Sequence, residues 1–321
     1  MRLLSCALPL ILMTSLSQLA YGQAYPTRPV RLIVAFAPGG PIDLLARPVS
    51  QKLTESLGQP FVIDFRTGGN GIIGTEHVAK SAPDGYTLQI FSSGHTINPS
   101  TQRFLPYDTL KDFTAISPVA RSEFVLVVNP KLAVNSVGEL VALAKSKPGA
   151  LNFSSSGTGG ALHLSGEFLK LTANIQMTHI PYKGAAPALL EVVAGNVDLA
   201  FVAAPPAIPQ IKAGKVRVIG IASQKRWAHL PDVPTIDEQG YPGFEVTAGY
   251  GLIAPAGTAR SVVGKLNETM ERMLSGSEVL SVLAKMGLDP WHLKPEQLQV
   301  WLTNDVQKWQ RVTKAIKYEP D

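Results

Sequence analysis

The stretch FAPGGPIDLLARP, residues 36–48, decides the class of fold because two kinds of periodicity meet in it. It ends an apolar run over residues 30–36 that is typical of a buried strand, and it begins a pattern over residues 42–57 whose apolar positions recur with helical spacing. A strand that turns through Gly39 and Gly40 into a helix is the repeating unit of a parallel sheet. Glycine at a helix start also lets a ligand approach the free backbone N–H groups, an arrangement that favours an anion.

Strand-like and helix-like stretches alternate along the rest of the chain, which predicts an α/β fold with a largely parallel sheet. Long extended patterns at residues 123–130 and 244–258 bracket a middle segment that has its own strands and helices. We therefore expect two lobes joined by two crossover strands, with residues 23–123 and 247–321 in lobe 1 and residues 124–246 in lobe 2. A ligand would bind between the lobes, and closure would be a hinge motion. Two amphipathic helices are expected after the second extended pattern.

The first 22 residues have the features of a signal peptide. Arg2 precedes an apolar stretch over residues 3–19, and small residues then favour cleavage after Gly22. We therefore expect an exported, periplasmic mature chain; a buried N-terminal helix is the alternative interpretation. Cleavage would remove Cys6, the only cysteine, so no disulfide is expected. Basic residues are scattered without a run, which argues against a nucleic-acid or membrane surface.

Sequence motifs for catalysis, cofactors and metals are weak. GNGIIG, residues 69–74, has the spacing of a dinucleotide-binding loop, but the next strand ends at Ser93 without the acidic residue that would bind a ribose. The sequence contains no nucleophile elbow, Walker loop or His-Glu-x-x-His motif. His163 and His179 lack metal-ligand spacing, so we expect structural roles for both. We predict no cofactor, no metal and no enzyme activity.

Five stretches share one pattern, in which a strand ends in small residues and a helix begins. They are PGGPID (38–43), RTGGNGIIGT (66–75), SSGHT (92–96), SSSGTGG (154–160) and PYKGAAP (181–187). Each helix start offers unpaired N–H donors and the positive end of a helix dipole. Each loop alone could be an ordinary turn, but the carboxyl ends of parallel strands meet at one edge of a sheet. We therefore expect the loops to cluster and to hold a carboxylate through backbone amides and hydroxyls.

Several charged or nucleophilic side chains keep two interpretations. Asp43 either interacts with the dipole of its own helix or receives an ammonium group or a water from the ligand, and Asp198 is either a strand-edge acid or a pocket residue. Arg66 and Lys183 are the charges available to pair directly with a carboxylate. A rival function is an exported hydrolase, with Ser156 as nucleophile and the SSGTGG loop as its oxyanion hole.

Seven stretches, in order along nearly the whole mature chain, carry a family resemblance. They are VAFAPGGPIDLLAR (34–47), RTGGNGIIGTEHVAKSAPDGYTL (66–88), LPYDTLKDFTAI (105–116), SSGTGGALHLSGEF (155–168), HIPYKG (179–184), GKVRVIGIASQKRWAHLPDVPTIDEQGYPGFE (214–245) and GLIAPAGT (251–258). Together they resemble the Bug-type solute receptors of tripartite tricarboxylate transport systems. The resemblance implies a periplasmic binding protein of type II, the Venus flytrap architecture, whose lobes close on a small organic acid or amino acid. In such receptors backbone amides and ordered waters of lobe 1 hold the carboxylate, and lobe 2 supplies most of the specificity.

The resemblance also implies a set of ligand-binding residues. These are Phe36, Gly39, Gly40, Asp43, Ser92 and Ser93 in lobe 1, and Ser155, Gly157, Thr158, Gly159, Tyr182, Gly184 and Asp198 in lobe 2. The sequence departs from the family pattern at residues 64–65, where Glu-Asn is usual, and at Ala37 and Thr67, where proline is common. Pro48 also lies inside the first helix. These departures could displace the first loop slightly, so the ligand's identity stays open.

We therefore predict a monomeric extracytoplasmic receptor that delivers a dicarboxylate, tricarboxylate, aromatic acid or amino acid to a tripartite tricarboxylate permease. A receptor that passes its signal to a sensor is the alternative. An exported hydrolase is the weaker rival.

Overall fold

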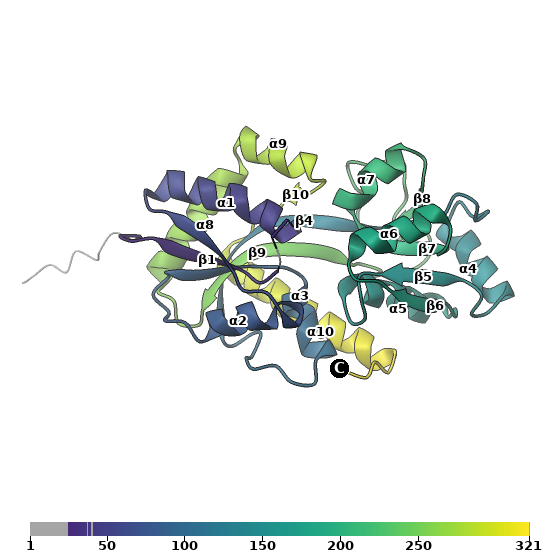
Figure 1. Cartoon of the computed structure of the whole chain (residues 1–321), viewed down its shortest axis with the longest axis horizontal. Coiled ribbons are helices and arrows are strands. Elements are labelled where there is room, and N and C mark those ends of the chain that lie inside the picture. The colour runs from purple at the N-terminus through teal and green to yellow at the C-terminus, as the bar shows by residue number, and fades with distance from the viewer. Residues whose placement is uncertain (1–24, 37, 40, 321) are drawn as a thin grey trace, which may run out of the picture.

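The computed structural model describes residues 25–36, 38–39 and 41–320, which form two lobes side by side (Figure 1). Lobe 1 contains β1 (Val30–Val34), α1 (Pro41–Leu57), β2 (Phe61–Phe65), η1 (Gly69–Gly71), α2 (Ile72–Ala79), β3 (Thr87–Phe91), α3 (Gly94–Thr101), α8 (Arg260–Leu274), α9 (Ser277–Lys285), β10 (Asp289–Pro290) and α10 (Pro295–Ala315). Lobe 2 contains α4 (Val137–Ser146), β5 (Asn152–Ser155), α5 (Ala161–Ala173), β6 (Thr178–Pro181), α6 (Ala185–Ala194), β7 (Leu199–Ala203), α7 (Ala204–Lys212) and β8 (Arg217–Ile221). β4 (Phe113–Val128) and β9 (Thr247–Pro255) lie at the junction of the lobes.

The strand order shows how the two lobes are connected. The sheet runs β2-β1-β3-β9-β4-β7-β5-β6, and β8 and β10 also pair with β4. β4 pairs with β9 over residues 113–123 and with β7 over residues 124–128, so it continues from one lobe into the other. The second crossing comes immediately before β9, whose Thr247 pairs with Glu123. The predicted α/β class is confirmed, but the prediction of a largely parallel sheet is wrong, because β4 and β9 run antiparallel to the strands they pair with. We keep the predicted lobe boundaries as a proposal.

Burial explains why these sequences form strands. Leu126 and Val128 of β4 belong to one buried cluster, and Val125 and Val127 belong to a second cluster, so both faces of the strand are covered. A strand buried on both faces has a continuous apolar sequence, as residues 124–128 do. The larger cluster also contains residues of β1, β3 and α1, so it extends into lobe 1.

Two helices escape sequence prediction. α7 contains three prolines, which argue against a helix. Pro205 and Pro206 lie in its first turn, where the missing N–H would have no helical partner, whereas Pro209 lies inside the helix and removes one helical hydrogen bond. α9 is a short helix that follows α8 after two residues, so its apolar stripe merges with that of its neighbour. β4 also begins ten residues before the expected extended segment. The predicted signal peptide, residues 1–22, and Gly40 lie outside the described residues.

Candidate functional site

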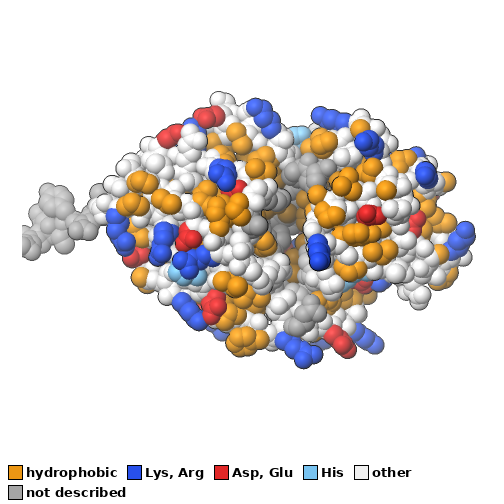
Figure 2. Space-filling model, in the orientation of Figure 1, with side chains coloured by type: hydrophobic (Ala, Val, Ile, Leu, Met, Phe, Trp, Pro, Cys, Tyr) orange, Lys and Arg blue, Asp and Glu red, His pale blue; other side chains and the backbone are white. Residues whose placement is uncertain are grey.

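A cavity of about 200 Å³ lies between the lobes, where Figure 2 shows the surface hollowed. Lobe 1 and lobe 2 both contribute to its wall. It is lined by Phe36, Asn70, Ser92, Ser93, Gly94, Ile97, Phe124, Ser156, Gly160, Ala161, Leu162, Ala203, Ala248 and Tyr250. Strand ends, helix starts and the crossing strands β4 and β9 therefore meet at one place.

The lobe 1 wall is built where β3 ends and α3 begins. Ser92 and Ser93 follow the strand, and Gly94 opens the helix. The Ser93 hydroxyl accepts a hydrogen bond from the Gly249 N–H at 3.2 Å, so it ties this loop to β9. Asn70, at a positive φ of 52°, donates from its side chain to the side-chain oxygen of Asn98 at 2.9 Å. These bonds hold the two loops of lobe 1 against the crossing strand.

The lobe 2 wall is the loop between β5 and α5, and two histidines support it. The Ser155 hydroxyl is hydrogen-bonded to His179 Nε2 at 2.7 Å, and the Gly159 N–H donates to His163 Nδ1 at 3.1 Å. The two imidazole rings stack with centroids 3.9 Å apart. This support leaves Ser156 and the first turn of α5 facing the cavity. The prediction of structural roles for both histidines agrees with these contacts.

The Ser155–His179 pair has the separation of a nucleophile and its base, as the hydrolase alternative would require. Ser155 is 0% exposed, and its hydroxyl also contacts both the N–H and the carbonyl of Gly157. A substrate carbonyl has no access to this oxygen. The contacts stabilise the loop instead, and Ser156, the serine that does face the cavity, has no imidazole partner among its described contacts.

Helix ends, not charged side chains, set the electrostatics of the cavity. Among the described residues that line it, none is Lys, Arg, Asp or Glu. α3 and α5 begin at its wall from opposite lobes. In α3 the N–H groups of residues 95–97 already donate to the carbonyls of Ser92 and Ser93, so this helix contributes mainly the positive end of its dipole. The positive ends of two helix dipoles therefore meet across the cleft, which favours an anion between them.

The contacts of Asp43 favour the first of its two interpretations, an interaction with the start of its own helix. The carboxylate is 1% exposed, accepts from the Gly39 N–H at 2.7 Å and pairs with Arg47 at 2.9 Å. These two hydrogen bonds, the one from Gly39 first, hold the pKa of Asp43 below its usual value. Its Oδ2 atom thus orders the start of α1 and the loop before it.

The structure brings together part of the predicted residue set. Phe36, Ser92 and Ser93 line the cavity, Gly39 lies in the turn before α1, and Asp43 lies in the first turn of α1. The lobe 2 loop residues that do not line the cavity lie just behind its wall or beside it. These are Ser155, Gly157, Thr158 and Gly159 in the β5–α5 loop, and Tyr182 and Gly184 in the β6–α6 loop.

Asp198 does not join this group, which corrects the prediction of a pocket role. Its carboxylate accepts from the Asn152 N–H at 2.8 Å, at the start of β5. Because β5 and β7 are parallel, this is the edge of the sheet opposite to the loops that line the cavity. Asp198 therefore takes the other of its two interpretations, that of a strand-edge acid.

Sequence reasoning misses the residues contributed by β4 and β9. Phe124 comes from the first, and Ala248 and Tyr250 come from the second. Their signal is that of an extended strand, and it does not show what either face of the strand contacts. Ala203 is missed because it precedes α7, a helix that the sequence does not predict.

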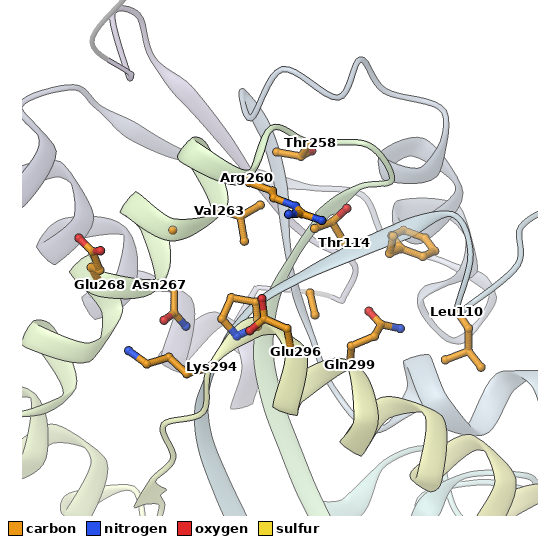
Figure 3. Close-up of a pocket in the computed structure, with 14 residues that line it drawn as sticks. Leu110, Thr114, Thr258, Arg260, Val263, Asn267, Glu268, Lys294, Glu296 and Gln299 are labelled. Atoms are coloured by element: carbon orange, nitrogen blue, oxygen red, sulfur yellow. The ribbon is translucent and has the colours of Figure 1, made fainter. Parts of the chain in front are cut away.

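A larger cavity of about 600 Å³ lies between the starts of α8, α10 and β4 (Figure 3). Its lining contains charged side chains of both signs, with Arg260 and Lys294 alongside Glu268 and Glu296. Every residue that lines it belongs to lobe 1, so closure of the lobes would not enclose a ligand there. The smaller cavity between the lobes is therefore the better candidate site.

A family model described as "Tripartite tricarboxylate transporter family receptor" matches residues 45–318. The protein BugT of Bordetella pertussis is 36% identical over 292 residues, which cover 90% of this chain and 90% of BugT.

Solved structures show the same similarity. The R. palustris protein Rpa4515, solved with adipate, is 36% identical with a TM-score of 0.82, covering 92% of this chain and 100% of that one. MatC from Rhodopseudomonas palustris, solved with bound malate, is 32% identical with a TM-score of 0.76 over 90% and 99% of the two chains. The periplasmic binding protein BugD is 32% identical with a TM-score of 0.77 over 92% and 100%. The two-lobed binding-protein fold that the resemblance implies is confirmed.

Proposed function

Because the chain belongs to the family of tripartite tricarboxylate transporter receptors, we propose that it binds a small organic carboxylate between its lobes and delivers it to a membrane permease. The observation that carries this proposal is the meeting of two helix starts across a cavity whose described lining is uncharged. Backbone N–H groups and hydroxyls can hold a carboxylate there without a cationic side chain.

The size of the cavity and the ligands bound to relatives both support a small acid as the ligand. A volume of about 200 Å³ lies below the range of drug-sized pockets. Relatives solved with adipate and malate bind dicarboxylates. Arg66 is paired with Asp64 at 3.1 Å, and neither Arg66 nor Lys183 lines the cavity, which supports amide and hydroxyl contacts to the ligand.

We propose that this protein binds its ligand and closes by a hinge motion, and that it catalyses no reaction. Export to the periplasm is supported by the predicted signal peptide and by similarity to a periplasmic binding protein. Among the described helices, none combines the length and apolarity of a membrane span. The transporter that the family description names supports a membrane permease as the partner.

A thermal-shift screen of the mature chain, residues 23–321, tests the proposal. The panel contains dicarboxylates, tricarboxylates, aromatic acids and amino acids, each beside its uncharged amide. A ligand at about 100 times its Kd stabilises the folded state by about 2.7 kcal/mol, which raises the Tm by a few degrees. We expect such a shift with at least one acid and none with its amide.

Two variants serve as controls for the mode of binding. Arg66→Met and Lys183→Met should each change the Kd of the acid identified by less than about threefold, since neither side chain contacts the cavity. Equal shifts with an acid and its amide would contradict the carboxylate proposal. A hundredfold loss in either variant would contradict the amide model of recognition.

A further inference from the structure

A second cavity, of about 380 Å³, lies behind the two crossing strands. Along β4, Phe124 faces the ligand cavity while its neighbour Glu123 faces the second cavity. Along β9, Ala248 faces the ligand cavity while Thr247 faces the second one, and Thr247 pairs with Glu123. Successive side chains of a strand point to opposite faces, so the hinge strands separate the two cavities.

Glu123 is the unusual group in this second cavity. It is 6% exposed, and its Oε2 atom has no hydrogen-bond partner among the described residues. The nearest cation, Arg121 Nε, lies 4.0 Å from Oε1 and is itself half exposed. A buried carboxylate with so little compensation is costly in its ionised form.

The surrounding charges do not relieve that cost. Asp289 of β10 and Glu245 before β9 are acids that line the same cavity, and Trp227 donates to Asp289 at 3.2 Å. The cations Lys225 and Arg226 also line it, but Arg226 is paired with Glu238 at 2.9 Å. His229 lies 3.9 Å from Asp289 and does not line this cavity.

We propose that Glu123 couples lobe closure to the loss of a proton, so that its ionised form favours the closed, ligand-bound receptor. The inference rests on the proposed function, since closure is taken to be driven by the ligand. Bending at two strands that closes the cleft on one face must open the cavity on the other. Closure therefore admits water to Glu123, and hydration stabilises the carboxylate.

The direction of the pH effect follows from this geometry. Burial raises the pKa of Glu123 to about 7; Asp289 and Glu245 act in the same direction, and Arg121 and Ser223 oppose them. If closure lowers that pKa, the closed state binds fewer protons, and closure becomes more favourable as the pH rises toward 7. The ligand itself should then bind more tightly at higher pH, and binding should release protons.

Calorimetric titration between about pH 6 and pH 8.5, with adipate and malate as probes, tests the coupling. We expect the Kd of the wild-type protein to fall about fivefold across this range if closure lowers the pKa of Glu123 by one unit from about 7. Glu123→Gln has the shape of the protonated acid and cannot ionise, so its Kd should stay at the low-pH value. Glu245→Gln, a change in the same cavity, should keep a pH-dependent Kd, with the transition moved to lower pH because the charge of Glu245 helps to raise the pKa of Glu123. A flat wild-type profile, or an unchanged slope in Glu123→Gln, would overturn the proposal.

A ligand-free measurement separates this inference from the proposed function. Trp227 lines the second cavity, so its fluorescence should show a transition near neutral pH that Glu123→Gln lacks. Tight binding without a pH slope would leave the proposed function intact and overturn the coupling. Failure of every acid to bind, with the fluorescence transition present, would overturn the function while supporting the ionisation of Glu123.

Discussion

His163 and His179 support the ligand cavity only as neutral imidazoles. His163 Nδ1 accepts the Gly159 N–H, which it can do only when that nitrogen carries no proton. Burial lowers the pKa of each histidine to about 4, and the charges of Lys170 and, for His179, of His163 act in the same direction. We therefore expect acidification to weaken the β5–α5 loop at these two residues before it affects the backbone contacts around them.

We predict that acidification destabilises the protein through this pair. The folded-state pKa of each ring lies below the unfolded value of about 6.5, so the unfolded chain binds more protons between about pH 6.5 and pH 4. Stability is complete above that window and falls as the pH drops through it. The loss should be on the order of a few kcal/mol for the pair, measured by urea denaturation at several pH values.

The double variant His163→Asn/His179→Gln provides the control for this effect. Its side-chain amides can occupy the positions of the two bonded ring nitrogens without titrating. The slope of stability against pH should be reduced. It should not vanish, because the pKa of buried His95 is also lowered to about 4. An undiminished slope in the double variant would assign the acid sensitivity to other groups.

α5 depends on a glycine that lets it pack closely against β5. A Cβ added to Gly166 would lie 2.2 Å from the ring of Phe153, which is fully buried and has no room to move. Gly166→Ala should therefore destabilise the fold by about 1–3 kcal/mol and, because α5 also lines the cavity, weaken ligand binding. Gly264 of α8 has nothing within 4 Å of the same position, so Gly264→Ala should stabilise by up to about 1 kcal/mol. Shifts of the urea midpoint in opposite directions for the two variants would support this account, and equal shifts would refute it.

Most of the fold can be predicted from sequence patterns on the scale of single helices and strands. Helix starts after glycine-rich turns are local signals, so the sequence alone predicts that the loops following β3 and β5 contribute to the ligand cavity. Which atom of such a loop faces the cavity cannot be deduced in this way. Ser155 turns inward because His179 lies beside it, and the pairing of β5 with β6 that brings them together is not a local property.

The hinge shows the same limit more clearly. The continuous apolar run in residues 124–128 predicts a strand, but the register that pairs Glu123 with Thr247 joins segments more than a hundred residues apart. Phe124 and Ala248 acquire a role in the site only through that register. Charged residues mislead for a related reason, since the carboxylate of Asp198 accepts from the Asn152 N–H of β5, and the sequence does not show that this strand lies beside Asp198.

The molecule as a whole works by closing two walls on one ligand. Ser92 and Asn70 come from lobe 1, and Ser156 and Ala203 come from lobe 2, so a ligand that contacts both walls binds the closed arrangement better than the open one. The energy available for closure is this difference in affinity. A receptor whose lobes cannot approach each other should therefore keep its fold and lose its ligand.

Ala203→Trp tests this dependence on closure. Ala203 lines the cavity at the end of β7 and is partly exposed, so an indole there occupies space between the lobes. We expect at least a tenfold loss of affinity for the acid identified by the screen, little change in the Tm without ligand, and loss of the ligand-induced decrease in radius of gyration measured by small-angle scattering. Ala142→Trp, on the exposed face of α4, should bind and contract like the wild type. Normal contraction in Ala203→Trp would mean that the ligand does not bind between the lobes.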